Sequence, residues 1–153
     1  MNHAMPYDVL GWIETTWTTS EDRAEMRVGD AEWFPWSGTV CLDGLGLPGD
    51  AVSNLLFGLA KEPAERALFA GRGLPPEPSR RVIDDYAEDQ RAVEPCFGHT
   101  FATLTELRSV RWDSFGVSLE ESAWSHVVRL MEELSEVDQF DADRVRIAVW
   151  ACW

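Results

Sequence analysis

Near both ends of the chain, apolar residues alternate with other residues, which is the pattern of a β-strand. Residues 7–19 are rich in aromatic and β-branched side chains without helical spacing, and both faces of the predicted strand are partly apolar. Residues 143–153 alternate in the same way. A third strand is predicted near 37–43, where Pro35 favours an edge or irregular position because proline cannot donate to a strand ladder. We expect the last strand to lie beside the first.

Apolar residues three and four positions apart predict helices between these strands. In the first helix the stripe consists of Val52, Leu55, Leu56 and Leu59, so this face must be buried. The helix from Ser79 carries a narrow stripe, and several helices begin with a side chain that can bond the free N–H groups of the first turn. The stripe of the last helix consists of Trp124, Val127, Val128, Met131 and Leu134. The predicted helix starts are an N-cap at Asp50, a helix from Ser79 to about Arg91, and capping boxes of Thr103 with Glu106 and of Ser118 with Glu121.

Strands at both ends with helices between them predict an α+β fold. We expect a small, mostly antiparallel sheet with helices packed on one face. A chain of 153 residues fits one globular domain spanning 1–153, with residues 1–5 frayed. No stretch is apolar over the length of a membrane-spanning helix, and the first residues lack the basic region of a signal peptide. We therefore expect a cytoplasmic protein that does not enter a membrane.

The net charge of −14 limits the classes of macromolecule that the protein can bind. Binding a nucleic-acid backbone requires Lys and Arg that displace counterions from the phosphates, so nucleic-acid binding is not expected. Acidic residues serve either solubility or the docking of a basic protein. Acid-rich runs over the second and the last predicted helices offer such a docking face.

Three cysteines are spread widely along the chain, at Cys41, Cys96 and Cys152. An odd number at such separations does not make a disulfide framework and fits a reducing compartment, so we expect them to be small core residues. Cys96 and His99 have the spacing of one half of a zinc site, but structural zinc sites usually show two close pairs. We therefore expect no metal and no cofactor.

No standard catalytic signature occurs in the sequence: it contains no phosphate-binding glycine loop, no nucleophile elbow and no zinc-protease helix motif. His99 is the remaining candidate for acid–base catalysis, because Gly98 frees the backbone beside it and Thr100 can hold the second ring nitrogen. It can equally contact a ligand or serve as a structural histidine. Enzymatic activity stays open, with a non-enzymatic protein favoured.

The stretch LFAGRGLP places Arg72 between two glycines, shortly before the N-terminus of the predicted Ser79 helix. A guanidinium and free helix N–H groups can together hold a carboxylate or a phosphate. The alternative is an ordinary turn in which Arg72 pairs with a surface acid. On the ligand hypothesis, Trp side chains stack on a planar, nucleotide-like ring. The residues predicted to form this ligand site are Arg72, His99, Trp12 and Trp36.

The chain contains eight tryptophans, and the stretch AEWFPWSG gathers two of them around Pro35. Such a cluster is core, the wall of a ligand pocket, or a patch for a partner. Aromatic anchors ringed by charged residues are typical of binding hot spots, and Pro35 argues against a central strand position. We predict an exposed partner-binding edge made of Glu32, Trp33, Phe34 and Trp36.

The order of several short motifs resembles a set of small uncharacterised proteins from bacteria and their phages. The motifs are GWIE, LLFGL, GRGLP, GHT, TLTEL and RIAVW, and they span most of the chain. The group has no known activity. The resemblance implies that a shared site or a shared scaffold includes Gly11, Trp12, Arg72 and His99. Occurrence in phages implies an accessory role, such as countering a host system by binding.

Three functions are consistent with these features. The first is a non-enzymatic acidic binding protein, an accessory inhibitor or sequestering protein that acts through an aromatic and acidic surface. The second is a small-ligand binder that captures an anionic, nucleotide-like molecule. The third is a hydrolase or transferase that depends on His99. We favour the first, with a protein partner of basic character.

Overall fold

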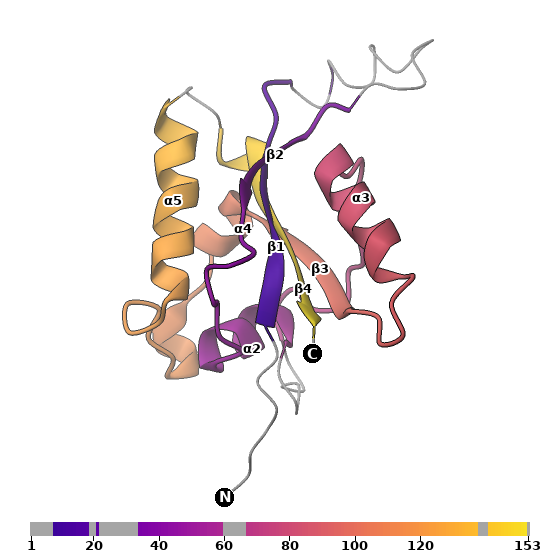
Figure 1. The fold of residues 1–153 in the computed structure, drawn as a ribbon. Coiled ribbons are helices and arrows are strands. Elements are labelled where there is room, and N and C mark those ends of the chain that lie inside the picture. The colour runs from indigo at the N-terminus through magenta and orange to yellow at the C-terminus, as the bar shows by residue number, and fades with distance from the viewer. Residues whose placement is uncertain (1–7, 19–20, 22–33, 60–66, 138–140, 153) are drawn as a thin grey trace, which may run out of the picture.

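Four strands form one antiparallel sheet in the order β2-β1-β4-β3 (Figure 1). The computed structural model describes residues 8–18, 21, 34–59, 67–137 and 141–152. The strands are β1 (Asp8–Thr15), β2 (Ser37–Cys41), β3 (Phe97–Thr103) and β4 (Val145–Cys152). The last strand lies beside the first, as predicted, and β2 at the edge follows Pro35. The predicted frayed residues 1–5 lie outside the described residues.

The two central strands approach each other closely at Gly11. This residue faces Val149 in the β1–β4 pairing and has a φ of 154°. A Cβ atom at this position would collide with the carbonyl oxygen of Ala148. Glycine is therefore required here by both the backbone conformation and the space.

The helices begin largely where their side-chain caps predict. They are α2 (Ala51–Phe57), α3 (Arg80–Asp89), α4 (Leu104–Arg108) and α5 (Trp124–Val137), with short 3-10 segments η1 (Trp112–Phe115) and η2 (Ala142–Arg144). Asp50 caps α2, Ser79 caps α3, and Thr103 with Glu106 forms the capping box of α4. These three caps are confirmed.

The start of α5 differs from the prediction. The expected capping box of Ser118 and Glu121 is wrong, because the helix begins only at Trp124. The hydroxyl of Ser122 accepts a hydrogen bond from the N–H of Trp124 and donates to the carboxylate of Asp50. This bond to the cap of another helix holds residues before 124 in a turn.

One face of the sheet is covered by α2, α4 and α5, and the main core lies there. The predicted apolar stripes of α2 and α5 point into this core, where Phe57 packs against Trp124 with ring centroids 5.7 Å apart. The indole N–H of Trp124 is satisfied by the carbonyl of Pro48 at 2.9 Å. The buried members contributed by the strands include Val9, Ile13, Val145, Ile147 and Val149.

The opposite face of the sheet is covered by α3 (Figure 1). The α+β class and the antiparallel sheet are confirmed, but the helices lie on both faces and not on one. The reason is that the alternate positions of the central strands also carry large apolar groups, including Trp12 and Trp150. Val82 of α3 is fully buried against them and completes a second, smaller core.

The cysteines differ from their predicted role. Cys96 and Cys152 form a disulfide across 56 positions of sequence, and Cys41 is exposed. The expectation that all three are separate core residues is therefore wrong. The disulfide joins the chain just before β3 to the last residue of β4.

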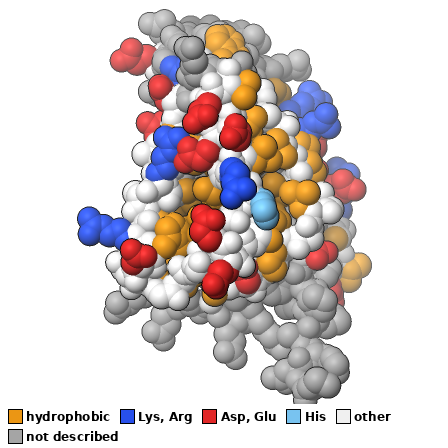
Figure 2. Space-filling view, turned by 90° about the vertical axis from the view of Figure 1, so that its left-hand side faces the viewer, with side chains coloured by type: hydrophobic (Ala, Val, Ile, Leu, Met, Phe, Trp, Pro, Cys, Tyr) orange, Lys and Arg blue, Asp and Glu red, His pale blue; other side chains and the backbone are white. Residues whose placement is uncertain are grey.

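The surface carries charges of both signs. Figure 2 shows the side of the molecule on which α5 lies, where acidic and basic side chains are interspersed with apolar ones. None of the helices in the described part of the chain combines the length and apolar character needed to cross a membrane.

Candidate functional site

A buried ion pair fixes one end of the α3 face. Glu14 of β1 faces Arg146 of β4, and the Arg146 Nε donates to the Glu14 carboxylate at 2.7 Å. Both side chains are almost completely buried. The second oxygen of Glu14 accepts the N–H of Ser79 at 2.7 Å, while the remaining Arg146 nitrogens donate to the carbonyls of Pro76 and Glu77. The pair therefore ties the sheet to the N-terminus of α3.

Trp36 belongs to this buried arrangement. Its ring lies 3.7 Å from the Arg146 guanidinium carbon and the residue is only 5% exposed. The predicted exposure of Trp36 is therefore wrong, because the ring is covered by a cation from the far end of the chain. Phe34 is exposed as expected, whereas Glu32 and Trp33 lie outside the described residues.

Trp12 is also engaged within the protein. Its indole N–H donates to the carboxylate of Asp85 on α3 at 2.6 Å, and the Arg81 guanidinium lies 5.8 Å from the ring centroid. Trp12 thus helps to hold α3 against the sheet. The sequence prediction did not single out Asp85, although Asp85 and Asp89 stand four positions apart on one side of the helix.

His99 lies between two aromatic rings on the α3 face. It stacks on Trp150 with centroids 5.5 Å apart, and Tyr86 of α3 meets it edge-on at 5.0 Å. Its Nε2 atom is buried without a hydrogen-bond partner among the described residues. Burial lowers the pKa of His99, so the imidazole is neutral at pH 7. The rings of Tyr86 and Trp150 therefore cover the imidazole and restrict its access to a substrate.

Arg72 is paired with one of the protein's own acids. Its two terminal nitrogens donate to the two oxygens of Glu106 at 2.8 and 2.7 Å, and the guanidinium lies near the rings of Phe69 and Phe101. The hydrogen bond from Arg72 lowers the pKa of Glu106. Glu106 is the same residue that closes the capping box of α4.

The predicted anion site is thus filled from within. The carboxylate of Glu106 binds the Arg72 guanidinium, and the carboxylate of Glu14 accepts the N–H of Ser79 at the start of α3. The backbone joins the loop to His99 through an N–H of Gly73 that donates to the His99 carbonyl. Among the described residues, the Arg72 guanidinium and the Ser79 N–H are thus both already paired with carboxylates of the protein itself.

Carboxylates gather between α3 and the β1–β2 edge. Burial and the nearby charge of Asp85 raise the pKa of Asp43, and burial with the charges of Asp85 and Asp43 raises that of Asp89. A ligand atom of Asp89 lies within 4.8 Å of the sulfurs of Cys96 and Cys152. These three residues are the candidate metal ligands of the described chain.

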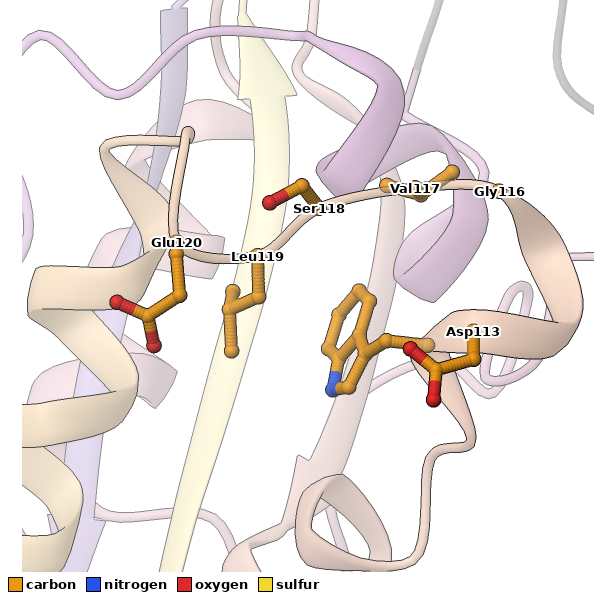
Figure 3. Close-up of a pocket in the computed structure, with 7 residues that line it drawn as sticks. Asp113, Gly116, Val117, Ser118, Leu119 and Glu120 are labelled. Carbon is orange, nitrogen blue, oxygen red and sulfur yellow. The ribbon is translucent and has the colours of Figure 1, made fainter.

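A surface hollow of about 510 Å³ lies on a different side, between η1 and α5 (Figure 3). Its lining consists of Trp112, Asp113, Gly116, Val117, Ser118, Leu119 and Glu120. Figure 3 shows Asp113 and Glu120 on opposite sides of Leu119. The lining contains no Lys, Arg or His, so the charged groups at this hollow are both acidic.

A second hollow of about 280 Å³ adjoins the first through residues 116–118. Its acids are Asp50 and Glu121. Asp50 is already committed, because its carboxylate caps α2 and accepts from Ser122. No sequence motif marks these two hollows. Residues 118–122, which help to line them, were predicted as the start of a helix, whereas the helix begins at Trp124.

No family model matches the chain, and neither a curated protein nor a solved structure was found to match it.

Proposed function

We propose that the protein is a non-enzymatic acidic binding protein, and that the Trp112 hollow receives an Arg or Lys side chain of a basic protein partner. The observation that carries the proposal is an aromatic residue in a hollow whose two charged residues, Asp113 and Glu120, are both acids. Carboxylates and an aromatic ring are the groups that recognise an organic cation.

The magnitudes suit reversible docking. A cation over an aromatic ring contributes about 0.5–1 kcal/mol at an exposed site. An exposed ion pair contributes roughly 0–1 kcal/mol. The net charge of −14 attracts a basic partner from a distance and speeds the encounter. Affinity therefore depends on several such contacts, and the hollow supplies the one with geometric selectivity.

The binding surface proposed here keeps the aromatic and acidic chemistry predicted from the sequence but changes its location. The predicted edge loses Trp36 to the core, while the Trp112 hollow combines both kinds of residue. An anionic ligand has less support, because Arg72 already holds Glu106. By covering a basic surface of its partner, the protein would sequester or inhibit it.

A titration with a short arginine-rich peptide tests the proposal, with binding followed by calorimetry. We expect Asp113→Asn and Glu120→Gln each to weaken binding two- to fivefold, which corresponds to the loss of about 0.5–1 kcal/mol. Trp112→Leu keeps an apolar residue but removes the aromatic face, and should weaken binding by a similar factor.

The matched control is Glu133→Gln, which removes an exposed acid of α5 away from the hollow lining. If this control weakens binding as much as the two hollow variants do, the attraction is general and the hollow is not the site. The same peptide with uncharged citrulline in place of each arginine should not bind.

A further inference from the structure

The disulfide end of α3 brings together three side chains that can bind a metal. Asp89 is the last residue of α3, Cys96 lies just before β3, and Cys152 ends β4. One ligand atom from each lies within 4.8 Å of the others. The three positions come from separate elements, so sequence spacing gives no sign of the cluster.

We propose that reduction of the Cys96–Cys152 disulfide creates a binding site for a thiophilic divalent cation, Zn²⁺ above all, with Asp89 as the third ligand. Thiolate sulfur and carboxylate oxygen are both established zinc ligands. Three protein ligands leave the fourth tetrahedral position to water. The oxidised pair cannot supply thiolates, so the site exists only in the reduced protein.

The surroundings of Asp89 favour a cation. One of its carboxylate oxygens is buried and has no hydrogen-bond partner among the described residues. Burial, together with the nearby carboxylates of Asp85 and Asp43, raises the pKa of Asp89 and disfavours its ionised form. A divalent cation would give the buried oxygen a partner and would offset the repulsion among the three acids.

The geometry asks for a modest movement. At Zn–S distances of about 2.3 Å, two sulfurs of a tetrahedral site lie about 3.8 Å apart, so the sulfurs must separate once the bond between them is broken. The Cα atoms of the two cysteines are 4.4 Å apart. Rotation of the two side chains separates the sulfurs without requiring the strands to part.

The chemistry balances with a dithiol as reductant. The dithiol transfers two electrons and two protons to the disulfide, becomes a cyclic disulfide itself, and leaves two thiols on the protein. Zinc then binds with release of the two thiol protons, while Asp89 binds as the carboxylate. A low-molecular-weight disulfide would reverse the change: it accepts two electrons, leaves as two thiols, re-forms the Cys96–Cys152 bond and so releases the metal.

Cobalt provides the direct probe, because thiolate-bound Co²⁺ absorbs in the near ultraviolet and tetrahedral Co²⁺ in the visible. The full chain is reduced with a dithiol, desalted without oxygen and titrated with CoCl₂. We expect both absorptions to appear with one equivalent of metal, to vanish on addition of Zn²⁺, and to be absent from the oxidised protein.

Variants assign the ligands. Cys152→Ser should abolish the thiolate absorption at stoichiometric metal, and Asp89→Asn should weaken cobalt binding tenfold or more. The matched controls are Cys41→Ser, the exposed third cysteine, and Asp84→Asn, an exposed acid of the same helix; both should bind as the unaltered chain does. Unchanged affinity in Asp89→Asn, or cobalt absorption that needs Cys41, would overturn the proposal.

Alkylation of the unaltered chain avoids any variant that fails to fold. In the reduced protein, Zn²⁺ should protect Cys96 and Cys152 from iodoacetamide while Cys41 reacts, as read by mass spectrometry of peptides. Equal alkylation of Cys96 and Cys152 with and without Zn²⁺ would also overturn the proposal.

Discussion

The two faces of the sheet are stabilised in different ways, although the same central strands supply both. On the face covered by α2, α4 and α5, the inward residues of β4 are apolar without exception: Val145, Ile147, Val149 and Ala151. On the face covered by α3, β4 instead contributes the guanidinium of Arg146 and the indole of Trp150. Within the described residues, three helices bury the first face, whereas α3 covers the second with a single buried apolar residue, Val82.

The difference shows that the directional contacts of the molecule lie on the α3 face, whereas the other face is stabilised by apolar burial. Apolar burial stabilises in proportion to area and has little directional preference, so a large apolar face tolerates small changes of shape. A buried ion pair is directional, and the loss of one partner leaves the other charged and desolvated. The α3 face therefore depends on a few specific contacts, namely the Glu14–Arg146 pair at one end and the Cys96–Cys152 disulfide at the other.

The largest effect should come from breaking the ion pair. Arg146→Met leaves Glu14 buried without its partner and should lower the free energy of unfolding by about 3–5 kcal/mol. Urea unfolding measures this loss. The double variant Glu14→Gln with Arg146→Met removes both charges and should recover a large part of it. A single variant as stable as the unaltered chain would show that apolar burial dominates both faces.

A core truncation on the other face gives the matching measurement. Met131 of α5 is fully buried, and Met131→Ala should cost about 2–5 kcal/mol through lost burial and a residual cavity. Here the resonances of α3 amides should stay in place, whereas Arg146→Met should shift them. If α3 responds equally to both substitutions, the two faces are not independent.

A smaller effect is expected where α3 meets β1. Trp12→Phe keeps an aromatic six-membered ring but removes the N–H that donates to Asp85. Because the pair is only partly buried, we expect a loss of about 1 kcal/mol, measured by thermal unfolding. Asp85→Asn retains an acceptor oxygen and should cost less. The opposite order would mean that the charge of Asp85, and not the hydrogen bond, holds the helix.

The smallest effect concerns pH. Burial lowers the pKa of His99 in the folded protein, so the unfolded chain takes up a proton at about pH 6.5 and the folded chain only at a lower pH. The stabilising contribution is complete above that pH and decreases as the pH falls below it. His99→Gln should reduce the loss of stability between about pH 7 and pH 5.5. Identical pH slopes in the two proteins would place His99 in contact with solvent.

Local signals in the sequence predicted most of the fold. Side chains that bond their own helix start, such as Asp50 and Thr103, act within a few positions, so the sequence displays them directly. Strands β1 and β4 were predictable because the patterns that mark them are also local. The position of α3 was not, since only the three-dimensional arrangement shows that both faces of β1 and β4 need a cover.

The candidate sites were much less predictable, because their partners are distant in sequence. Arg72 meets Glu106 from 34 positions away, and Trp36 is covered by Arg146 from the last strand. Composition indicated an aromatic and acidic protein but did not distinguish buried Trp36 from the hollow at Trp112. Ion pairing across the fold, unlike helix capping, has no short-range pattern.

The partnership of Glu14 and Arg146 also determines when the protein can fold. The two residues are separated by 132 positions, yet their strands form the centre of the sheet. During synthesis β1 therefore emerges early but can pair with β4 only after β4 has been made. Bringing the two strands together closes a loop of more than a hundred residues, which is entropically slow. The local helices can form meanwhile, whereas the Glu14 carboxylate stays hydrated until Arg146 has been synthesised and β4 pairs with β1. We therefore expect the centre of the sheet to become native after the local helices.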